Sequence, residues 1–330
     1  MLASALVGLL GCTGDPDEAP TERGRPAADL FVSTAGSDDD ACTATAPCST
    51  FARAYAVARP GDVIEIASGT YPSQELSADP RKRAGKAVVF RPAKGGRVVV
   101  DGDLDVYASG VELRRLTVTD NWYAKPGSAS VTFRNVDAAK FYVASASDIR
   151  VLGGRIGPSV DAVAQIKAAD GSPVPPRDIL IDGVTFRDFT RSTPDKHMEC
   201  LHVMAVEGLV VRNSSFKRCT IFDISLKEHG ETEAMRNITI EESEFGRPIG
   251  GTTAINVSTS GSPCFNVLIR RNRSNAGINV QCDGKNIRIE ENELPSMNAY
   301  TCSHSGAARW DHNVYAEGVP CGPNDAVRGG

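Results

Sequence analysis

One stretch of the chain, from His197 to Lys227, concentrates the side chains that could carry acid–base chemistry. His202, Asp223 and Lys227 alternate with apolar residues inside it, and Glu199 lies just before the first alternating run. Alternation with a period of two is typical of strands with one buried and one exposed face. We therefore expect a histidine, carboxylates and a lysine on one exposed surface, where they could transfer protons.

Further polar side chains are expected on the same surface, at alternating positions of neighbouring segments. Lys167, Asn256 and Asn279 are the members that could bind a substrate through an ammonium or amide group. Some of these residues could instead have a purely structural role. Lys227 and Glu228 could form an exposed ion pair, and Asn256 and Asn279 could form an amide ladder. The coincidence of several such groups on one face is what favours a functional surface.

The elements that must position this surface repeat along the chain. The repeating unit is a pair of apolar residues separated by one residue and followed by a turn, and successive pairs begin 18 to 30 residues apart. Such a period, with several short strands per unit, predicts coils of parallel β-structure that bury their apolar faces by stacking. The pairs are Ile64/Ile66, Val88/Phe90, Val111/Leu113, Val131/Phe133, Ile149/Val151, Ile179/Ile181, Leu209/Val211, Ile238/Ile240, Val267/Ile269 and Ile287/Ile289.

Asparagine or glycine follows many of these pairs. Both residue types tolerate the left-handed backbone of a tight corner, so we expect positive φ angles at these positions. The residues are Gly153, Gly183, Asn213, Asn272, Asn292 and Asn313.

The N-terminal segment suggests export. Residues 1–12 are apolar and end in Leu9-Leu10-Gly11-Cys12, which resembles a bacterial lipobox with Cys12 as the lipidated residue. This segment is too short to span a bilayer. Residues 13–28 are rich in Pro, Asp, Glu and Arg and predict a flexible tether, which leaves 29–330 as a single domain. We therefore expect an extracellular protein, lipid-anchored to the bacterial cell envelope.

The remaining eight of the nine cysteines predict four disulfides. An even number of cysteines in an exported chain suggests disulfides, whereas zinc is disfavoured by the lack of a C-x-x-C pair. Three of the pairs are separated by 18 or 19 residues, so each could join neighbouring coils whose strands lie about 4.8 Å apart. The expected pairs are Cys42–Cys48, Cys200–Cys219, Cys264–Cys282 and Cys302–Cys321.

The amino-acid composition limits which kinds of binding partner we expect. The 330 residues carry a formal net charge of −5 and are 41 % hydrophobic, as is usual for a soluble globular chain. No basic patch stands out, which argues against nucleic acid. We expect a monomer.

The region from Phe31 to Tyr71 combines a short strand, a polar loop, a helix that Ser49-Thr50 can cap and a second strand. Its distinctive residues are Phe31-Val-Ser33, Gly36-Ser37, Pro47, Ser49-Thr50-Phe51, Ala54, Ala58-Arg-Pro60-Gly61-Asp62-Val63-Ile64 and Gly69-Thr70-Tyr71. These residues resemble the opening of proteins of the pectin lyase-like superfamily. The resemblance covers roughly Asp29 to Tyr315. It implies an all-β fold, a right-handed parallel β-helix (β-solenoid) with a short N-terminal capping helix.

That superfamily includes polysaccharide lyases, glycoside hydrolases, epimerases and phage tailspikes, and no catalytic motif of a single branch matches this sequence. Our first hypothesis is a lyase that acts on a uronic-acid polymer. Lys227 or His202 would remove the proton next to the sugar carboxylate. Lys167, Asn256 or Asn279 would hold that carboxylate.

Two other functions stay open. A glycoside hydrolase would use Glu199 and Asp223 as its pair of carboxyl groups. A non-catalytic envelope protein would bind a glycan or a partner, although an aromatic content of 6 % leaves few platforms for stacking on sugars. The candidate platforms are Trp122, Tyr123, Tyr300 and Trp310.

We expect no cofactor. Calcium is kept as an alternative at Asp101, Asp103 and Asp105, because carboxylates at alternate positions of a strand point to one side. The EF-hand pattern does not fit, since Val106 occupies the position that requires glycine.

Overall fold

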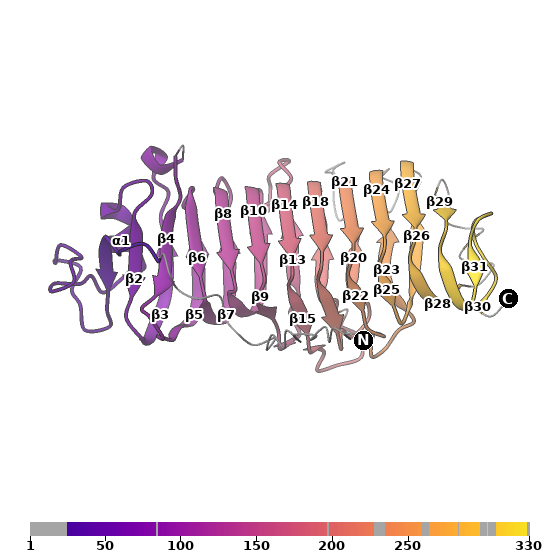
Figure 1. The fold of residues 1–330 in the computed structure, drawn as a ribbon, viewed down its shortest axis with the longest axis horizontal. Coiled ribbons are helices and arrows are strands. Elements are labelled where there is room, and N and C mark those ends of the chain that lie inside the picture. Colours follow the sequence, from indigo (N-terminus) through magenta and orange to yellow (C-terminus); the bar gives the residue numbers. More distant parts are fainter. Residues whose placement is uncertain are drawn as a thin grey trace, which may run out of the picture.

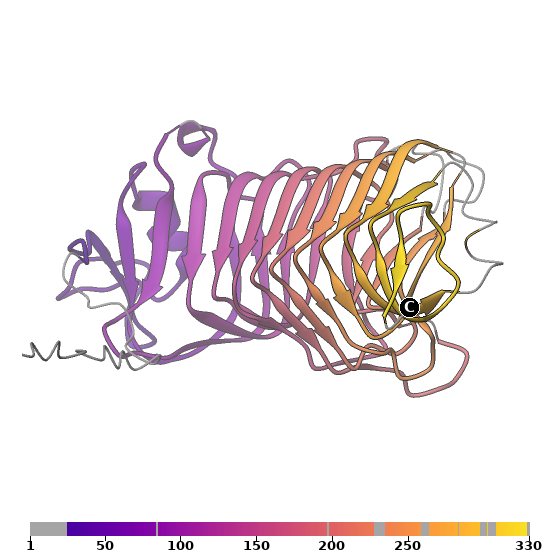
Figure 2. The same cartoon turned by 45° about the vertical axis from the view of Figure 1, so that its right-hand side comes forward.

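The chain folds into one elongated stack of parallel coils (Figure 1). Figure 2 brings the C-terminal end forward and shows that each coil winds around a common interior. The predicted right-handed parallel β-helix is confirmed. The computed structural model describes residues 25–83, 85–196, 198–227, 235–258, 264–282, 284–297, 302 and 308–328.

The first sheet contains one strand from each coil and runs along the whole stack. Every pairing in it is parallel, and the predicted apolar pairs lie opposite one another, as Ile179 does to Leu209 and Leu209 to Ile238. Its strands, in spatial order, are β1 (Leu30–Val32), β2 (Val63–Ile66), β4 (Val88–Pro92), β6 (Val111–Arg114), β8 (Ala129–Arg134), β10 (Ser147–Leu152), β14 (Arg177–Asp182), β18 (Val206–Arg212), β21 (Met235–Glu241), β24 (Phe265–Arg270), β27 (Lys285–Glu290) and β29 (Ala308–Asp311).

Longer strands in the early and late coils bend across the other two faces. They are β3 (Gly69–Leu76), β5 (Val98–Val106), β7 (Leu116–Ala124), β9 (Asp137–Ala144), β28 (Glu293–Met297) and β30 (Val314–Gly318). The two-residue strand β31 (Ala326–Val327) pairs with β30 at the C-terminal end.

In the middle coils each long strand is replaced by two short ones. The second sheet contains β11 (Arg155–Ile156), β15 (Thr185–Arg187), β19 (Ser215–Lys217), β22 (Glu244–Phe245) and β25 (Arg273–Ser274). The third sheet contains β13 (Ala164–Lys167), β17 (Leu201–Val203), β20 (Ile224–Leu226), β23 (Thr253–Ser258) and β26 (Gly277–Gln281). A separate pair, β12 (Ser159–Val160) and β16 (Phe189–Thr190), lies in the loops between these sheets.

Aromatic rings stack along the interior at the spacing of the coils. The rings of Phe186 and Phe216 are parallel with centroids 4.7 Å apart, and Phe245 continues the stack at 5.0 Å. Trp122 is fully buried between Phe133 and Phe141. Stacking of this kind adds to the burial of apolar surface that holds neighbouring coils together.

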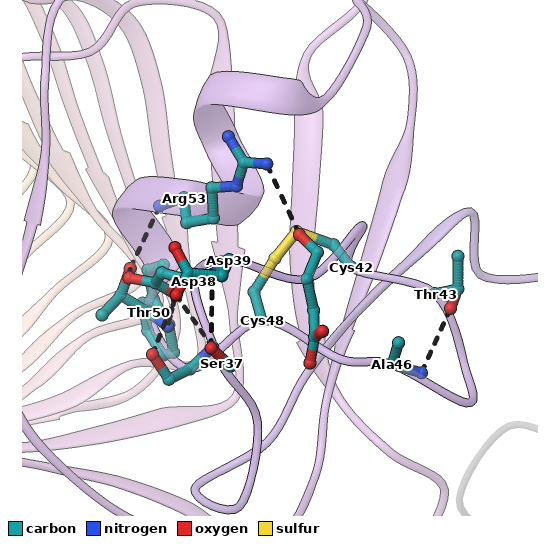
Figure 3. The surroundings of a disulfide bond; sticks show 12 residues. Ser37, Asp38, Asp39, Cys42, Thr43, Ala46, Cys48, Thr50 and Arg53 are labelled. Atoms are coloured by element: carbon teal, nitrogen blue, oxygen red, sulfur yellow. Dashed lines mark hydrogen bonds between the residues drawn. A yellow bond between two sulfur atoms is a disulfide. The ribbon is translucent and has the colours of Figure 1, made fainter.

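The expected helix α1 (Phe51–Val57) covers the N-terminal end of the stack (Figure 1). Thr50 caps it by accepting a hydrogen bond from the Arg53 N–H, and Asp38 in turn accepts from the Thr50 hydroxyl (Figure 3). Phe51 and Tyr55 are buried beneath the helix, as its sequence pattern predicts. A 3₁₀ turn, η1 (Pro80–Lys82), lies nearby.

The described residues begin at Arg25, within the predicted tether. Arg25 donates hydrogen bonds to Glu65 and to the Pro92 carbonyl at 2.8 and 2.7 Å, which fixes the end of the predicted tether on the first sheet. The lipobox with Cys12 and the rest of the tether lie outside the described residues. Within those residues, no helix is both long and apolar enough to cross a bilayer.

All four predicted disulfides are confirmed. Cys42–Cys48 closes the loop before α1 (Figure 3), and the other three bridges span 18 or 19 residues with Cα atoms 5.0 to 6.1 Å apart. Cys200 precedes β17 and Cys219 follows β19 in the next coil, so this bridge joins neighbouring coils as the spacing predicts.

The corner prediction is correct for Gly153, Gly183 and Asn213, which have φ angles of 67°, 71° and 50°. It is wrong for Asn272, Asn292 and Asn313, which follow their apolar pairs one residue later than Asn213 does. The left-handed residue is the one before each of them: Arg271, Glu291 and His312.

These later asparagines instead form a ladder inside the corner. Asn292 Oδ1 accepts hydrogen bonds from the Asn272 backbone and side-chain amides, both at 3.0 Å, and Asn292 Nδ2 donates to the Ile269 carbonyl at 2.9 Å. Asn313 repeats the arrangement one coil further on. The amides satisfy buried backbone groups that a corner would otherwise leave unpaired.

Asn292→Ala should therefore destabilise the fold by at least about 2 kcal/mol, because it leaves buried donors of Asn272 without an acceptor. Asn275→Ala is the matched control, since Asn275 is exposed, and should cost less than about 0.5 kcal/mol. Urea unfolding of both variants measures the difference. Equal stability of the two variants would show that the ladder contributes nothing.

Candidate functional site

A single outward row of side chains crosses the third sheet, and we call it the His202 row. Its members are register partners on successive coils: Tyr123, Tyr142, Gln165, His202, Ser225, Asn256 and Asn279. The flanking residues Leu201, Val203, Ile224 and Leu226 are buried in the interior. The alternation in the sequence thus correctly places His202 outward, on a surface that packing keeps rigid.

A cavity of about 650 Å³ lies over this row, and we call it the first cavity. It extends from Tyr142 on β9 to Asn256 and Ser258 on β23. The loops before β13, β17 and β20 form its other wall. The lining side chains with relevant chemistry are Tyr142, Glu199, His202, Phe222, Lys227 and Asn256.

Four of the seven predicted catalytic and binding residues therefore share one cavity: Glu199, His202, Lys227 and Asn256. His202 lies on β17, and Lys227 directly follows the adjacent β20, where its backbone N–H donates to the Val203 carbonyl at 2.9 Å. Glu199 is 5 % exposed and lies in the loop that enters β17. A base, a cation and a carboxylate therefore face the same space.

Lys167 and Asn279, which were predicted to bind substrate, do not line the first cavity. Lys167 forms an ion pair with Asp170 at 2.9 Å. Asn279 Nδ2 donates a hydrogen bond of 2.7 Å to Asn256 Oδ1. Because the Asn256 oxygen is engaged in this way, its amide nitrogen is the group left to donate to a ligand.

Asp223 was expected on the exposed face with Ser225 and Lys227, and that expectation is wrong. The structure buries Asp223 completely, and it does not line the first cavity. Neither carboxyl oxygen has a hydrogen-bond partner among the described residues. Burial raises the pKa of Asp223 to about 8, because the charged form is poorly solvated there. The carboxyl group is accordingly neutral at neutral pH.

Asp161 contributes a fixed charge to the cavity wall. Its carboxylate accepts hydrogen bonds from the Lys196 ammonium at 2.6 Å and from the backbone and hydroxyl of Ser192. The hydrogen bond from Lys196 is the main cause that lowers the pKa of Asp161 to about 2. This ion pair ties the loop before β13 to the loop before β17, so it shapes the cavity wall.

The sequence analysis missed the aromatic side chains of the cavity, Tyr142 and Phe222. Alternation in the segment Lys140-Phe-Tyr142 could have placed Tyr142 outward. Phe222 is in phase with the buried Ile224 and Leu226, so alternation alone would have placed it inside. The predicted platform Trp122 is buried, and Trp310 is 4 % exposed. Tyr300 lies outside the described residues.

Tyr123 is half-buried and meets Tyr142 edge to face, with ring centroids 5.6 Å apart. The Lys125 ammonium lies 3.9 Å from the centroid of the Tyr123 ring. These contacts fix the aromatic end of the first cavity.

The three carboxylates considered for calcium each have a separate partner. Asp101 accepts from the Thr119 hydroxyl at 3.0 Å, and Asp105 pairs with Lys125 at 3.0 Å. Asp103 accepts from the Asn121 amide at 3.4 Å. Nowhere in the described ranges do three or more acidic, histidine or cysteine side chains come together in a way that could hold a metal ion.

Comparison with known proteins identifies the fold. No family model and no curated protein matches the sequence. Among solved structures, XylC in complex with xylose aligns with a TM-score of 0.56 and 8 % identity, over 90 % of this chain and 85 % of that one. An alginate lyase from Paenibacillus sp. str. FPU-7 aligns with a TM-score of 0.51 and 14 % identity, over 90 % and 97 % of the two chains. At such identities the likeness shows a shared architecture.

The burial of Asp223 predicts a specific pH dependence. Between about pH 3.8 and pH 8 the unfolded chain ionises this carboxyl while the folded chain keeps its proton, so the free energy of unfolding falls as pH rises, by up to about 1.4 kcal/mol per pH unit. Asp223→Asn removes this contribution. The variant should therefore gain stability over the wild type as pH rises through this window.

Denaturant unfolding at about pH 5 and about pH 8 measures this difference. The exposed Asp39→Asn variant controls for the chemical change itself. A gain for Asp223→Asn that is the same at both pH values would contradict the assignment.

Proposed function

We propose that this chain acts on an extracellular polysaccharide at the first cavity, as a lyase that cleaves a uronic-acid polymer. One observation carries the proposal: the cavity assembles His202, Lys227 and Asn256 on three consecutive coils and excludes Asp223. The assembled groups are the types that β-elimination requires. The pair of carboxyl groups expected for hydrolysis, Glu199 and Asp223, is not assembled there, and the other carboxylate in the wall, Asp161, is held in an ion pair with Lys196.

The reaction follows from those three groups. Histidine is a common general base near neutral pH, so His202 takes the proton from the sugar carbon next to the carboxylate. Lys227 and the Asn256 amide stabilise the negative charge that develops on that carboxylate. The electron pair forms a carbon–carbon double bond as the bond to the 4-linked oxygen breaks. That oxygen takes a proton from water to become a hydroxyl, and the protonated His202 returns its proton to the resulting hydroxide.

A glycoside hydrolase is the second candidate, because Glu199 lies in the cavity wall. Hydrolysis requires two carboxyl groups about 5–5.5 Å apart for retention or roughly 6.5–9.5 Å apart with room for water for inversion. Asp223 has no access to the cavity in this structure, so Glu199 lacks its expected partner. This is why the lyase is preferred.

A non-catalytic envelope protein that binds glycan is the third candidate. Tyr142 and Phe222 give the cavity two apolar surfaces suited to sugar rings, which also serves binding without cleavage. The two similar structures, one described with xylose and one as an alginate lyase, support a carbohydrate ligand without choosing between cleavage and binding.

The disulfides support a location outside the cytoplasm, because such bonds persist in oxidising compartments. Together with the lipobox, they support the proposal that the protein is anchored to the bacterial cell envelope through Cys12. We also propose that it acts as a monomer. Mass spectrometry of the mature N-terminus tests the anchor, since it should show a lipid on Cys12 after cleavage of the signal.

A screen of acidic and neutral polysaccharides tests the function. We expect a new ultraviolet-absorbing double bond to appear with an acidic polymer. New reducing ends without that absorbance would indicate a hydrolase. Binding with neither product would indicate a non-catalytic protein.

On a cleaved substrate, His202→Ala and Lys227→Ala should each reduce turnover by roughly 10²-fold or more, because each removes a group that acts in the transition state. Lys217→Ala is the matched control, since Lys217 is exposed on the second sheet, and should leave turnover unchanged. Thermal unfolding should be nearly unaltered in all three. Full activity in both cavity variants would remove the catalytic role from this site.

A further inference from the structure

A second cavity of about 720 Å³ lies on the same side of the stack, towards the C-terminal end. It extends over coils that follow the first cavity, from Thr253 on β23 to Glu317 on β30. The functions proposed above do not use it.

The two cavities meet at the asparagine pair of the His202 row. Asn256 lines the first cavity and Asn279 lines the second, and their side chains are hydrogen-bonded at 2.7 Å. Strand β23 borders both cavities, with Thr253 in the second and Ser258 in the first. A ligand that leaves the first cavity along the stack therefore passes directly into the second.

The two cavities together are long enough to hold a polymer. From Tyr142 to Glu317 the two cavities together cross seven coil-to-coil steps, through β13, β17, β20, β23, β26, β28 and β30. At about 4.8 Å per step this is roughly 34 Å, the length of several sugar units and far longer than a disaccharide.

One end of the second cavity has the chemistry to bind an acidic sugar, whereas the carboxylate of Glu317 lies three coils away at the other end. Arg247 lies in its wall, on the loop between β22 and β23, and forms no ion pair with any other described residue. A guanidinium group binds a carboxylate with two parallel hydrogen bonds. The other polar lining groups, which include Thr252, Asn275 and Ser296, can bond sugar hydroxyls.

We propose that the second cavity is the distal half of one continuous groove and that Arg247 binds a carboxylate of the polymer several units away from the unit that meets His202. The inference rests on the proposed function and adds to it a preferred substrate, a long anionic chain. Arg247 is a binding residue that takes no part in the chemical step. Its removal accordingly weakens the binding of long chains only.

The test uses size-fractionated oligosaccharides of alginate and polygalacturonate, with calorimetric titration in the His202→Ala background to suppress cleavage. Affinity should rise with chain length until the chain spans both cavities. Arg247→Gln should weaken long-chain binding roughly 10- to 100-fold, the effect of one charge-assisted hydrogen bond, and leave short chains unaffected. Arg247→Lys should fall in between, because it keeps the charge and loses the paired geometry.

Arg97→Gln is the matched control, since Arg97 is exposed in the turn between β4 and β5. It should change neither the affinity for short chains nor the affinity for long chains. Equal effects of Arg247→Gln on short and long chains, or no effect on either, would overturn the distal assignment while the proposed function stands. If no acidic oligosaccharide binds, whatever its length, the proposed function fails together with this inference.

Discussion

The hydrogen-bonded register between successive coils is the constraint on which the rest of the molecule depends. Each coil is too thin to bury its own apolar face, so it is stable only when the next coil covers it. The register that aligns Leu201 with Ile224 inside also aligns His202 with Ser225 outside. A shift of one residue would exchange the two faces and bring apolar side chains into the cavity. Stability and the candidate site therefore depend on the same alignment.

The corners show how the stack accommodates polar groups in its interior. Glu291 and His312 adopt the left-handed backbone, which is unfavourable for such residues, and the adjacent Asn292 and Asn313 repay that cost with buried hydrogen bonds between coils. Asp223 has no comparable partner among the described residues. Its burial beside a cavity of ionisable groups departs from this pattern, as does that of the Trp122 indole N–H.

Much of this could be predicted from the sequence, because the repeated apolar pairs determine the inward face. The same pairs predicted the fold, the cysteines one coil apart predicted three of the four disulfides, and the cap at Ser49-Thr50 predicted the helix α1. The loops could not be predicted, since they vary in length from coil to coil and decide which row members are covered. That is why Asp223 was misplaced, why Lys167 was grouped with residues whose cavity it does not line, and why Phe222 and Arg247 were missed.

The central claim is that the outward face of the third sheet is where a polysaccharide meets this protein. A crystal structure of the His202→Ala variant with a bound uronate oligosaccharide tests it most directly. The account predicts sugar density along the His202 row, with one ring against Tyr142 and a carboxylate near Lys227 and the Asn256 amide. Density on the first or second sheet instead, with the His202 row empty, would contradict it.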